Sequence, residues 1–218
     1  MNLIGILVSV IFVFAIIFIS DIFSKKGILK EEGSRKFIHI GVSNWWIIAM
    51  IFFKSNIYAA VVPFLFIIIN YISYKKNIFS SMERNSEKNS PGTVFYAISL
   101  FILSLITFSA NSSPYIGAAG ILTMGYGDGF AAIFGKKFGK KKIKFLDSEK
   151  SIIGSLFMFI FTFVIIFILM SVSGISNRFF VPVLISFVAM LTELFSPFGT
   201  DNLTVPLLVS FIYYIFNY

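Results

Sequence analysis

Long apolar stretches constrain the fold of this chain more than any other feature of its sequence. A helix that spans a membrane needs about 20 predominantly apolar residues. Eight stretches approach this length: 2–22, 37–53, 56–74, 92–109, 113–134, 151–173, 178–195 and 202–217. We therefore predict an all-α fold, a polytopic membrane helical bundle of about eight transmembrane helices, built as one domain over residues 1–218. No basic region precedes the first stretch and no clear small-residue cleavage site follows it, so we expect it to remain as a helix.

Composition excludes several classes of protein. The chain is 57% hydrophobic and 13% charged, whereas soluble domains average about 45–50% apolar and about 25% charged residues. An ordinary cytosolic globule and a disordered chain are therefore excluded. The absence of cysteine excludes disulfides and cysteine nucleophiles, and the single histidine, His39, cannot form a multi-histidine zinc site. The net charge of +8 accompanies 29 Phe, which favours a basic membrane protein over a nucleic-acid binder.

Basic residues collect in every second connection between the apolar stretches. Sixteen of the 18 Lys and Arg residues lie in 25–36, 75–88 and 136–150, and the other two are Lys54 and Arg178. Cytoplasmic loops are enriched in Lys and Arg. We therefore predict that these three connections face the cytoplasm and that both termini lie outside.

Acidic and small polar residues cluster on the same side as these basic connections. They occupy 83–93, 128–151 and 193–202, whereas the opposite connections are short and consist mainly of small uncharged residues. A pore or carrier more often places its polar groups near the bilayer midplane. We therefore expect the chemistry of this protein at the cytoplasmic face.

A glycine-rich run from Gly125 to Lys140 is the densest of these clusters. Seven of the 15 glycines fall between Gly117 and Gly139. Such glycines permit close helix packing, or they let a phosphate approach the backbone with lysines beyond it. Asp128 favours the phosphate interpretation, because a carboxylate within an apolar span is costly and indicates a functional site. Its predicted task is to hold Mg²⁺ on a nucleotide phosphate, and the alternative is a structural ion pair with a neighbouring lysine.

The connection that follows this run carries seven lysines. Most are expected to bind the anionic lipid surface, which attracts basic segments by about 1 kcal/mol per residue. Lys136 and Lys150 differ because they lie at predicted helix ends, and Lys150-Ser151 opens the sixth apolar stretch. A helix N-terminus with a lysine beside it predicts a phosphate site.

Two further clusters precede and follow this region. Arg35, Lys36 and His39 share one face of a predicted helix because of their spacing. This face is expected to bind phosphate or handle a proton, and the alternative is a histidine whose hydrogen bonds are satisfied locally at the membrane edge. Ser90 and Pro91 are typical of a helix start.

Near the carboxyl end, Glu193 closes the seventh stretch and Thr200, Asp201 and Asn202 begin the eighth. Asp201 alone is explained by a helix N-cap. Three acids from separate apolar stretches, among cytoplasmic cations, nevertheless predict a pocket for a magnesium–nucleotide complex.

The motifs in chain order are Arg35-Lys36-x-x-His39, Pro91-Gly92-Thr93, Gly127-Asp128-Gly129-x-Ala131-x-x-x-Gly135-Lys136-x-x-Gly139-Lys140, Lys150-Ser151-x-x-Gly154-Ser155, and Glu193 with Gly199-Thr200-Asp201-Asn202-x-x-x-Pro206. Together they resemble the dolichol kinase, phytol kinase and CTP-dependent diacylglycerol kinase family, also described as the polyprenol kinase family. The resemblance implies an integral membrane enzyme that uses CTP, or a related nucleoside triphosphate, to phosphorylate a lipid alcohol such as a polyprenol, dolichol, phytol or diacylglycerol. The chain length suits bacterial, archaeal and phytol-kinase-like members, so we expect a prokaryotic cell membrane.

This hypothesis gives each candidate residue a role. The catalytic residues are Asp128 and His39, either of which is a candidate base for the attacking hydroxyl. The predicted Mg²⁺ ligands are Asp128, Glu193 and Asp201. The residues expected to contact CTP are Arg35, Lys36, Gly127, Gly129, Gly135, Lys136, Gly139, Lys140, Lys150, Ser151, Thr200 and Asn202. The expected partners are a lipid alcohol and a nucleoside triphosphate within a membrane, without nucleic acid, and a homo-oligomer is left open.

Two alternatives remain. Phosphatidate cytidylyltransferases, the CDP-diacylglycerol synthases, are similar in their Asp-x-x-Ala and Gly-x-x-Phe-Gly-Lys stretch. They continue with Ser-Pro-Lys-Lys-Thr-x-Glu-Gly and end with Lys-Asp and His-Gly-Gly-x-x-Asp-Arg, where this chain reads Lys150-Ser-Ile-Ile-Gly-Ser and Gly199-Thr-Asp-Asn. That departure favours a kinase. A transporter is the alternative from another class.

Overall fold

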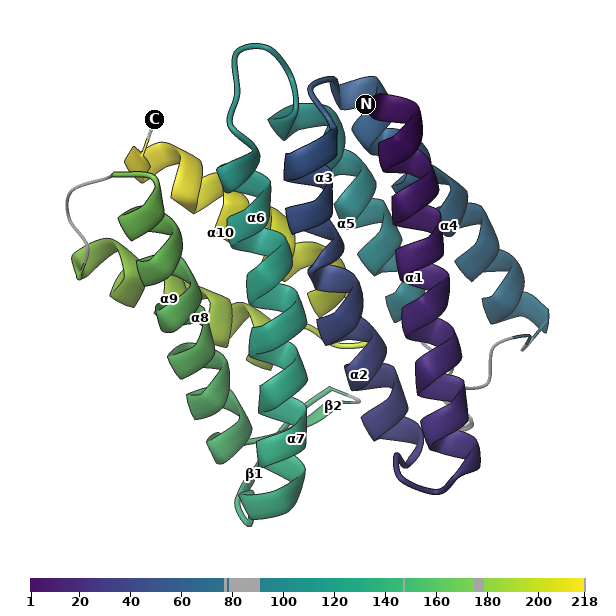
Figure 1. Ribbon diagram of the computed structural model, residues 1–218. Helices are drawn as coiled ribbons and strands as arrows, with labels where there is room; N and C mark the ends of the chain where they lie inside the picture. The colour runs from purple at the N-terminus through teal and green to yellow at the C-terminus, as the bar shows by residue number, and fades with distance from the viewer. Residues whose placement is uncertain (77, 79–90, 147, 175–178, 218) are drawn as a thin grey trace.

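The computed structural model describes residues 1–76, 78, 91–146, 148–174 and 179–217 (Figure 1). The acidic and basic side chains predicted to precede the fourth apolar stretch, Glu83, Arg84, Glu87 and Lys88, lie outside the described residues, as does Ser90.

The described residues form a bundle of α-helices with one π-helical segment and one small hairpin. The elements are α1 (Asn2–Lys25), α2 (Glu31–Ser43), α3 (Trp45–Phe52), α4 (Asn56–Lys76), α5 (Gly92–Thr107), α6 (Pro114–Leu122), η1 (Thr123–Asp128), α7 (Gly129–Phe138), β1 (Lys142–Phe145), β2 (Ser148–Ser151), α8 (Ile152–Val172), α9 (Phe180–Leu194) and α10 (Asp201–Asn217). The all-α membrane-type fold is therefore confirmed. The antiparallel β1–β2 hairpin is a feature that the apolar pattern does not predict.

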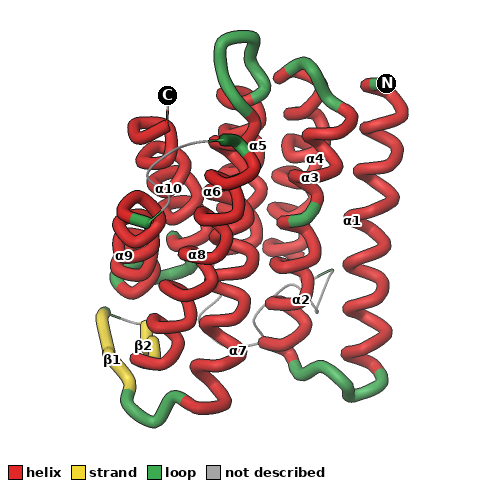
Figure 2. Tube along the Cα trace, turned by 60° about the vertical axis from the view of Figure 1, so that its left-hand side comes forward, coloured by secondary structure: helices red, strands yellow, loops and turns green. Residues whose placement is uncertain are grey.

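The connections separate into two ends of the bundle. Figures 1 and 2 both place the α1–α2 connection, the end of α7 and the hairpin at the lower end, and both termini and the α5–α6 connection at the upper end. This arrangement agrees with the predicted alternation between connections rich in Lys and Arg and connections that carry few charges. Which end faces the cytoplasm stays a prediction.

The predicted count of eight full-length spans is not confirmed. Among the described residues, four helices are long and apolar enough to cross a membrane: Asn2–Lys25, Asn56–Lys76, Pro114–Phe138 and Ile152–Val172. The stretch 37–53 is divided between α2 and α3. Helices α5, α9 and α10 are apolar but have only 16, 15 and 17 residues, which at 1.5 Å per residue corresponds to about 22–26 Å.

The helix formed by α6, η1 and α7 runs through the interior of the bundle. Of its apolar window, 72% is buried, compared with 28% for α1 and for α8. Pro114 at its start suits a first helical turn, and the Ser113 hydroxyl accepts a hydrogen bond from the Tyr115 amide at 3.4 Å. The indole nitrogen of Trp46 donates to the Pro114 carbonyl at 2.9 Å, which ties α3 to α6. Its buried position explains the many glycines of this helix, because neighbouring helices approach it from several sides.

Gly120 gives a test of this packing. A Cβ atom there would lie 2.2 Å from the Pro206 carbonyl oxygen and 2.4 Å from the Ser210 hydroxyl of α10. Because a backbone atom cannot move aside as a side chain does, we expect Gly120→Ala to destabilise the protein by about 2–3 kcal/mol. The midpoint of thermal unfolding in one fixed detergent should fall by about 4–12 °C.

Gly33→Ala is the matched control, because a Cβ at Gly33 would meet only the Leu29 side chain at an ordinary 3.5 Å or more. Alanine is a better helix former than glycine by about 1 kcal/mol, so the Gly33 variant should melt at or above the wild-type temperature. Equal melting temperatures for the two variants would show that the α6–α10 contact does not carry this constraint.

Candidate active site

Three carboxylates from three separate elements meet inside the bundle. Asp128 ends η1, Glu193 lies in the last turn of α9, and Asp201 begins α10. One oxygen from each lies within 4.8 Å of the other two. The residues are only 3%, 3% and 7% exposed. Oxygen ligands gathered in this way suit a hard divalent cation such as Mg²⁺.

Two lysines from other elements neutralise part of this charge. Lys36 of α2 forms an ion pair with Asp128, and both side chains are buried. Lys150 of β2 forms ion pairs with Glu193 and with Asp201, the latter at 3.0 Å. Three carboxylates and two ammonium groups leave one formal negative charge. Burial lowers the pKa of Lys150, but the charges of Asp201, Glu193 and Asp128 together more than offset this effect and raise that pKa above its ordinary value.

One carboxylate oxygen of the cluster has no hydrogen-bond partner among the described residues. It is the Oε2 atom of Glu193, and it is buried. An unsatisfied buried carboxylate oxygen is costly. Together with the excess negative charge, this oxygen fits a set of ligands for a divalent cation.

The chain between α9 and α10 is shaped to bring Glu193 and Asp201 together. Phe198 and Gly199 adopt the left-handed conformation, with φ of 56° and 77°, which reverses the chain within a few residues. The Asn202 side-chain amide then donates to the Gly199 carbonyl and to Asp201 Oδ1, both at 3.0 Å. The Thr200 hydroxyl donates to the Pro197 carbonyl at 2.7 Å. Thr200 and Asn202 therefore hold the turn that presents Asp201.

The hairpin positions Lys150. Lys150 pairs with Ile143 across the two strands, and the chain then enters α8 at Ser151. The Ser151 hydroxyl caps this helix by accepting a hydrogen bond from the Gly154 amide at 3.0 Å. The predicted helix start at Lys150-Ser151 therefore lies beside the carboxylate cluster.

The glycines of the predicted phosphate run pack against other helices. A Cβ at Gly135 or Gly139 would lie 2.6 or 2.5 Å from the Ser151 hydroxyl. At Gly127 it would meet Met158 and at Gly129 it would meet Ile40, at 2.6 and 2.5 Å. The structure thus shows close helix packing at Gly127, Gly129 and Gly135, which is the alternative weighed from the sequence, and a close contact of Gly139 with the end of β2. Their contact with phosphate stays a prediction.

Among the described residues, three of the predicted nucleotide-binding cations form no ion pair with the three carboxylates. Lys136 and Lys140 are exposed, and Lys136 follows Asp128 by two helical turns, about 12 Å along the axis. Arg35 forms an ion pair with Glu32 on the same helix at 2.5 Å. Contact between these cations and a nucleotide remains a prediction.

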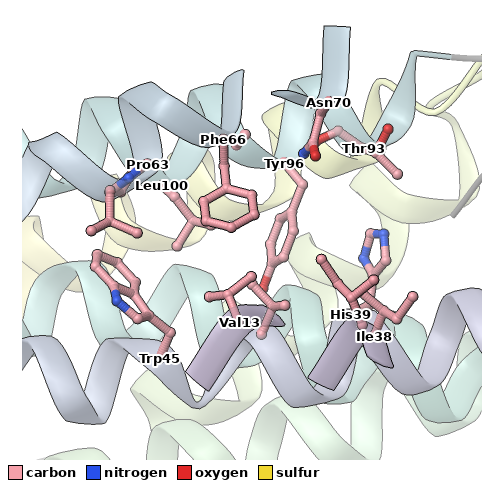
Figure 3. A pocket seen from close by; sticks show the side chains of 14 residues that line it. Val13, Ile38, His39, Trp45, Pro63, Phe66, Asn70, Thr93, Tyr96 and Leu100 are labelled. Atoms are coloured by element: carbon pink, nitrogen blue, oxygen red, sulfur yellow. The ribbon is translucent and has the colours of Figure 1, made fainter. Parts of the chain in front are cut away.

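His39 lies one helical turn from Lys36, on α2, as the sequence spacing predicts. Its ring stacks on Tyr96 of α5 with centroids 4.8 Å apart and an interplanar angle of 15°. His39 also lines an apolar pocket together with Asn70 of α4 and Thr93 of α5 (Figure 3). The Asn70 side-chain amide donates to the Thr93 carbonyl at 3.0 Å.

Sequence reasoning missed Asn70 and Tyr96. The signal for Asn70 was present, because a lone amide in an apolar stretch is as informative as Asp128. The motif Pro91-Gly92-Thr93 was found, and the structure explains its position. A Cβ at Gly92 would lie 3.0 Å from the Asn202 side chain, so this motif lies against the turn that carries Asp201.

Comparison with known proteins gives relatives at the level of sequence. The chain is 31% identical over 203 residues to phytol kinase of Synechocystis sp., covering 88% of this chain and 83% of that protein. It is 32% identical over 163 residues to phytol kinase 1, chloroplastic, of Arabidopsis thaliana, covering 70% and 52%. It is 30% identical over 145 residues to farnesol kinase, chloroplastic, of the same plant, covering 62% and 46%.

The chain spans about half the length of these two plant relatives, at 52% and 46%. Neither a protein-family model nor a solved structure matches it.

Proposed function

This chain belongs to the phytol kinase family, and from that premise we propose that it transfers the γ-phosphoryl group of a nucleoside triphosphate to the hydroxyl of a membrane lipid alcohol. The observation that carries the proposal is the convergence of Asp128, Glu193 and Asp201 with Lys36 and Lys150. The relatives act, by their names, on phytol and farnesol. Both are single-chain alcohols, and we propose that this protein uses alcohols of that class.

Phosphoryl transfer requires mainly positioning and stabilisation of charge. A Mg²⁺ ion held by Asp128, Glu193 and Asp201 would supply positive charge to the phosphate oxygens. Lys150 lies within the carboxylate cluster and would contact the same phosphates. The exposed Lys136 and Lys140 would contact the outer part of the triphosphate. Lys36 holds Asp128 in place by its buried ion pair.

The reaction also moves a proton. The alcohol oxygen forms a bond to the γ-phosphorus, and the bond between the γ-phosphorus and the oxygen that bridges it to the β-phosphate breaks. The hydroxyl proton passes to a base, and the nucleoside diphosphate leaves. Asp128 is engaged with Lys36, whereas the Nδ1 atom of His39 has no hydrogen-bond partner among the described residues. We therefore propose His39 as the residue that contacts the reacting hydroxyl.

The donor and the membrane side are part of the proposal. CTP is proposed as the donor because the motif resemblance implies it. The end that carries the hairpin is proposed as the cytoplasmic one, because 16 of the 18 basic residues lie in connections predicted to share that side. Both termini would then lie outside.

The test is a panel of lipid alcohols incubated with the purified full chain, Mg²⁺ and either CTP or ATP labelled in the γ-phosphate. We expect label in the phosphate ester of phytol or farnesol, with CTP the better donor. Asp128→Asn protein is the control for contaminating kinases. Absence of label from every alcohol contradicts the proposal. A parallel reaction uses phosphatidate and CTP labelled in the α-phosphate. Label in a CDP-lipid, with release of diphosphate, would instead support a cytidylyltransferase.

A further inference from the structure

An apolar pocket lies between α1, α2–α3, α4 and α5, next to the carboxylate cluster. Its walls include Val13, Val62, Phe66 and Leu100. Figure 3 shows Trp45, Pro63 and Leu100 on one side of it and His39, Asn70 and Thr93 on the other. Its volume of about 50 Å³ is several times the roughly 10–15 Å³ that one water molecule needs. The pocket is therefore large enough for part of an organic ligand.

Four polar side chains in the lining of this pocket each carry an atom that has no hydrogen-bond partner among the described residues. His39, Asn70, Thr93 and Tyr96 are 5%, 7%, 9% and 5% exposed. Among the described residues, no hydrogen-bond partner exists for His39 Nδ1, Asn70 Oδ1, Thr93 Oγ1 or the Tyr96 hydroxyl. Buried polar atoms are nearly always paired. Several unpaired atoms in the wall of one apolar pocket therefore indicate a ligand that brings a polar group with it.

The polar side of the pocket leads to the proposed reaction centre. His39 lies one helical turn from Lys36, which pairs with Asp128. Thr93 follows Gly92, which packs against Asn202 beside Asp201. A hydroxyl placed among these polar side chains would thus lie close to the carboxylate cluster, and its hydrocarbon chain would lie between the helices.

We propose that this pocket binds the hydroxyl-bearing end of the acceptor alcohol, with the hydroxyl contacting His39, Thr93 and Asn70 and the first carbons of the chain lying against Ala97 and Leu100. This inference rests on the proposed function. Diacylglycerol carries two acyl chains next to its hydroxyl, whereas a single-chain primary alcohol carries one. Because the pocket is small, we expect it to favour the single-chain alcohol over diacylglycerol.

Ala97→Phe is the first test. Ala97 is 2% exposed, lines the pocket and lies one turn beyond Thr93 on α5. We expect the larger side chain to raise the KM for farnesol and phytol at least tenfold while the KM for the nucleotide changes less than twofold. Leu105→Phe is the matched control, because Leu105 is on the same helix, 36% exposed and outside the pocket.

Thr93→Val is the second test and covers the case in which Ala97→Phe does not fold. Valine has the shape of threonine but lacks the unpaired hydroxyl. Because removing an unsatisfied buried group relieves its cost, the variant should be as stable as the wild type or more so. We expect the KM for the alcohol to rise about five- to tenfold. A gain in stability with a loss of alcohol affinity separates a ligand contact from a structural one.

A photoreactive farnesol that carries a diazirine gives a measurement independent of catalysis. It should label peptides of α4 and α5, and an excess of phytol, but not diacylglycerol, should reduce the labelling. If the wild type phosphorylates no alcohol, the proposed function is wrong. A second outcome overturns the pocket assignment alone. In it the wild type is active, both variants keep the wild-type KM for the alcohol, and the photoreactive farnesol labels peptides outside α4 and α5.

Discussion

Replacing Asp128 with asparagine is expected to lower kcat by about 1,000-fold or more, which corresponds to about 4 kcal/mol of transition-state stabilisation. Asparagine has the same shape but no negative charge, so the cluster loses a predicted cation ligand. The variant also leaves Lys36 buried without its carboxylate. Initial rates with γ-labelled CTP and farnesol across a Mg²⁺ titration measure the loss.

Three controls separate chemistry from stability in the Asp128 experiment. Asp128→Glu keeps the charge and should retain more activity than Asp128→Asn. Combining Lys36→Met with Asp128→Asn removes both charges of the buried pair, so stability should recover while activity stays absent. Asp21→Asn changes an aspartate whose side chain is 36% exposed in a surface pair with Lys25, and it should act as wild type. Activity above one tenth of wild type in Asp128→Asn would remove Asp128 from the proposed mechanism.

Lys150→Met has the second largest expected effect. The variant leaves Glu193 and Asp201 facing each other without their shared ammonium group. Breaking a fully buried pair costs about 3–5 kcal/mol. Because 21% of the Lys150 side chain is exposed, we expect a smaller loss of about 2–3 kcal/mol in the free energy of unfolding. We also expect kcat/KM to fall about 100-fold, because the negative charge on the nucleotide phosphates loses the ammonium group of Lys150.

Magnesium distinguishes this interpretation from simple misfolding. Without Lys150 the cluster gains one unit of negative charge, so added Mg²⁺ should raise the melting temperature of the variant more than that of the wild type. Lys142→Met is the matched control, because Lys142 lies in the same hairpin with 62% of its side chain exposed in a pair with Glu149. An equal response of the wild type and both variants to Mg²⁺ would mean that Lys150 does not contact a cation site.

The helices were predictable because membrane thickness and apolar length are directly related. The predicted stretch 56–74 corresponds to α4 (Asn56–Lys76), and 151–173 corresponds to α8 (Ile152–Val172). The break between α2 and α3 was not predictable, because it depends on contacts made after folding. Asn44 donates to the Ile40 carbonyl at 2.8 Å and accepts from the Tyr126 hydroxyl of η1 at 2.8 Å.

The candidate site was predictable to a similar extent. A charge inside an apolar stretch is costly, and this rule identified Asp128. Glu193 and Asp201 were predicted from their positions at the ends of apolar stretches, among basic residues. The identity of each ion partner was not predictable, because it depends on how helices pack. Asp128 pairs with Lys36, 92 residues away in the chain, rather than with the lysines that follow it. The unpaired polar atoms around Tyr96 depend in the same way on the packing of α2 against α5.

If the short helices α5, α9 and α10 cross the membrane, their lengths predict a local deformation of the lipid. Their lengths of about 22–26 Å fall below the roughly 30 Å of a typical hydrocarbon core. Such hydrophobic mismatch is relieved when the surrounding bilayer thins. Lipid headgroups would then descend toward the level at which α9 ends and α10 begins. A water-soluble donor and a greasy acceptor would meet there without either one leaving its own phase.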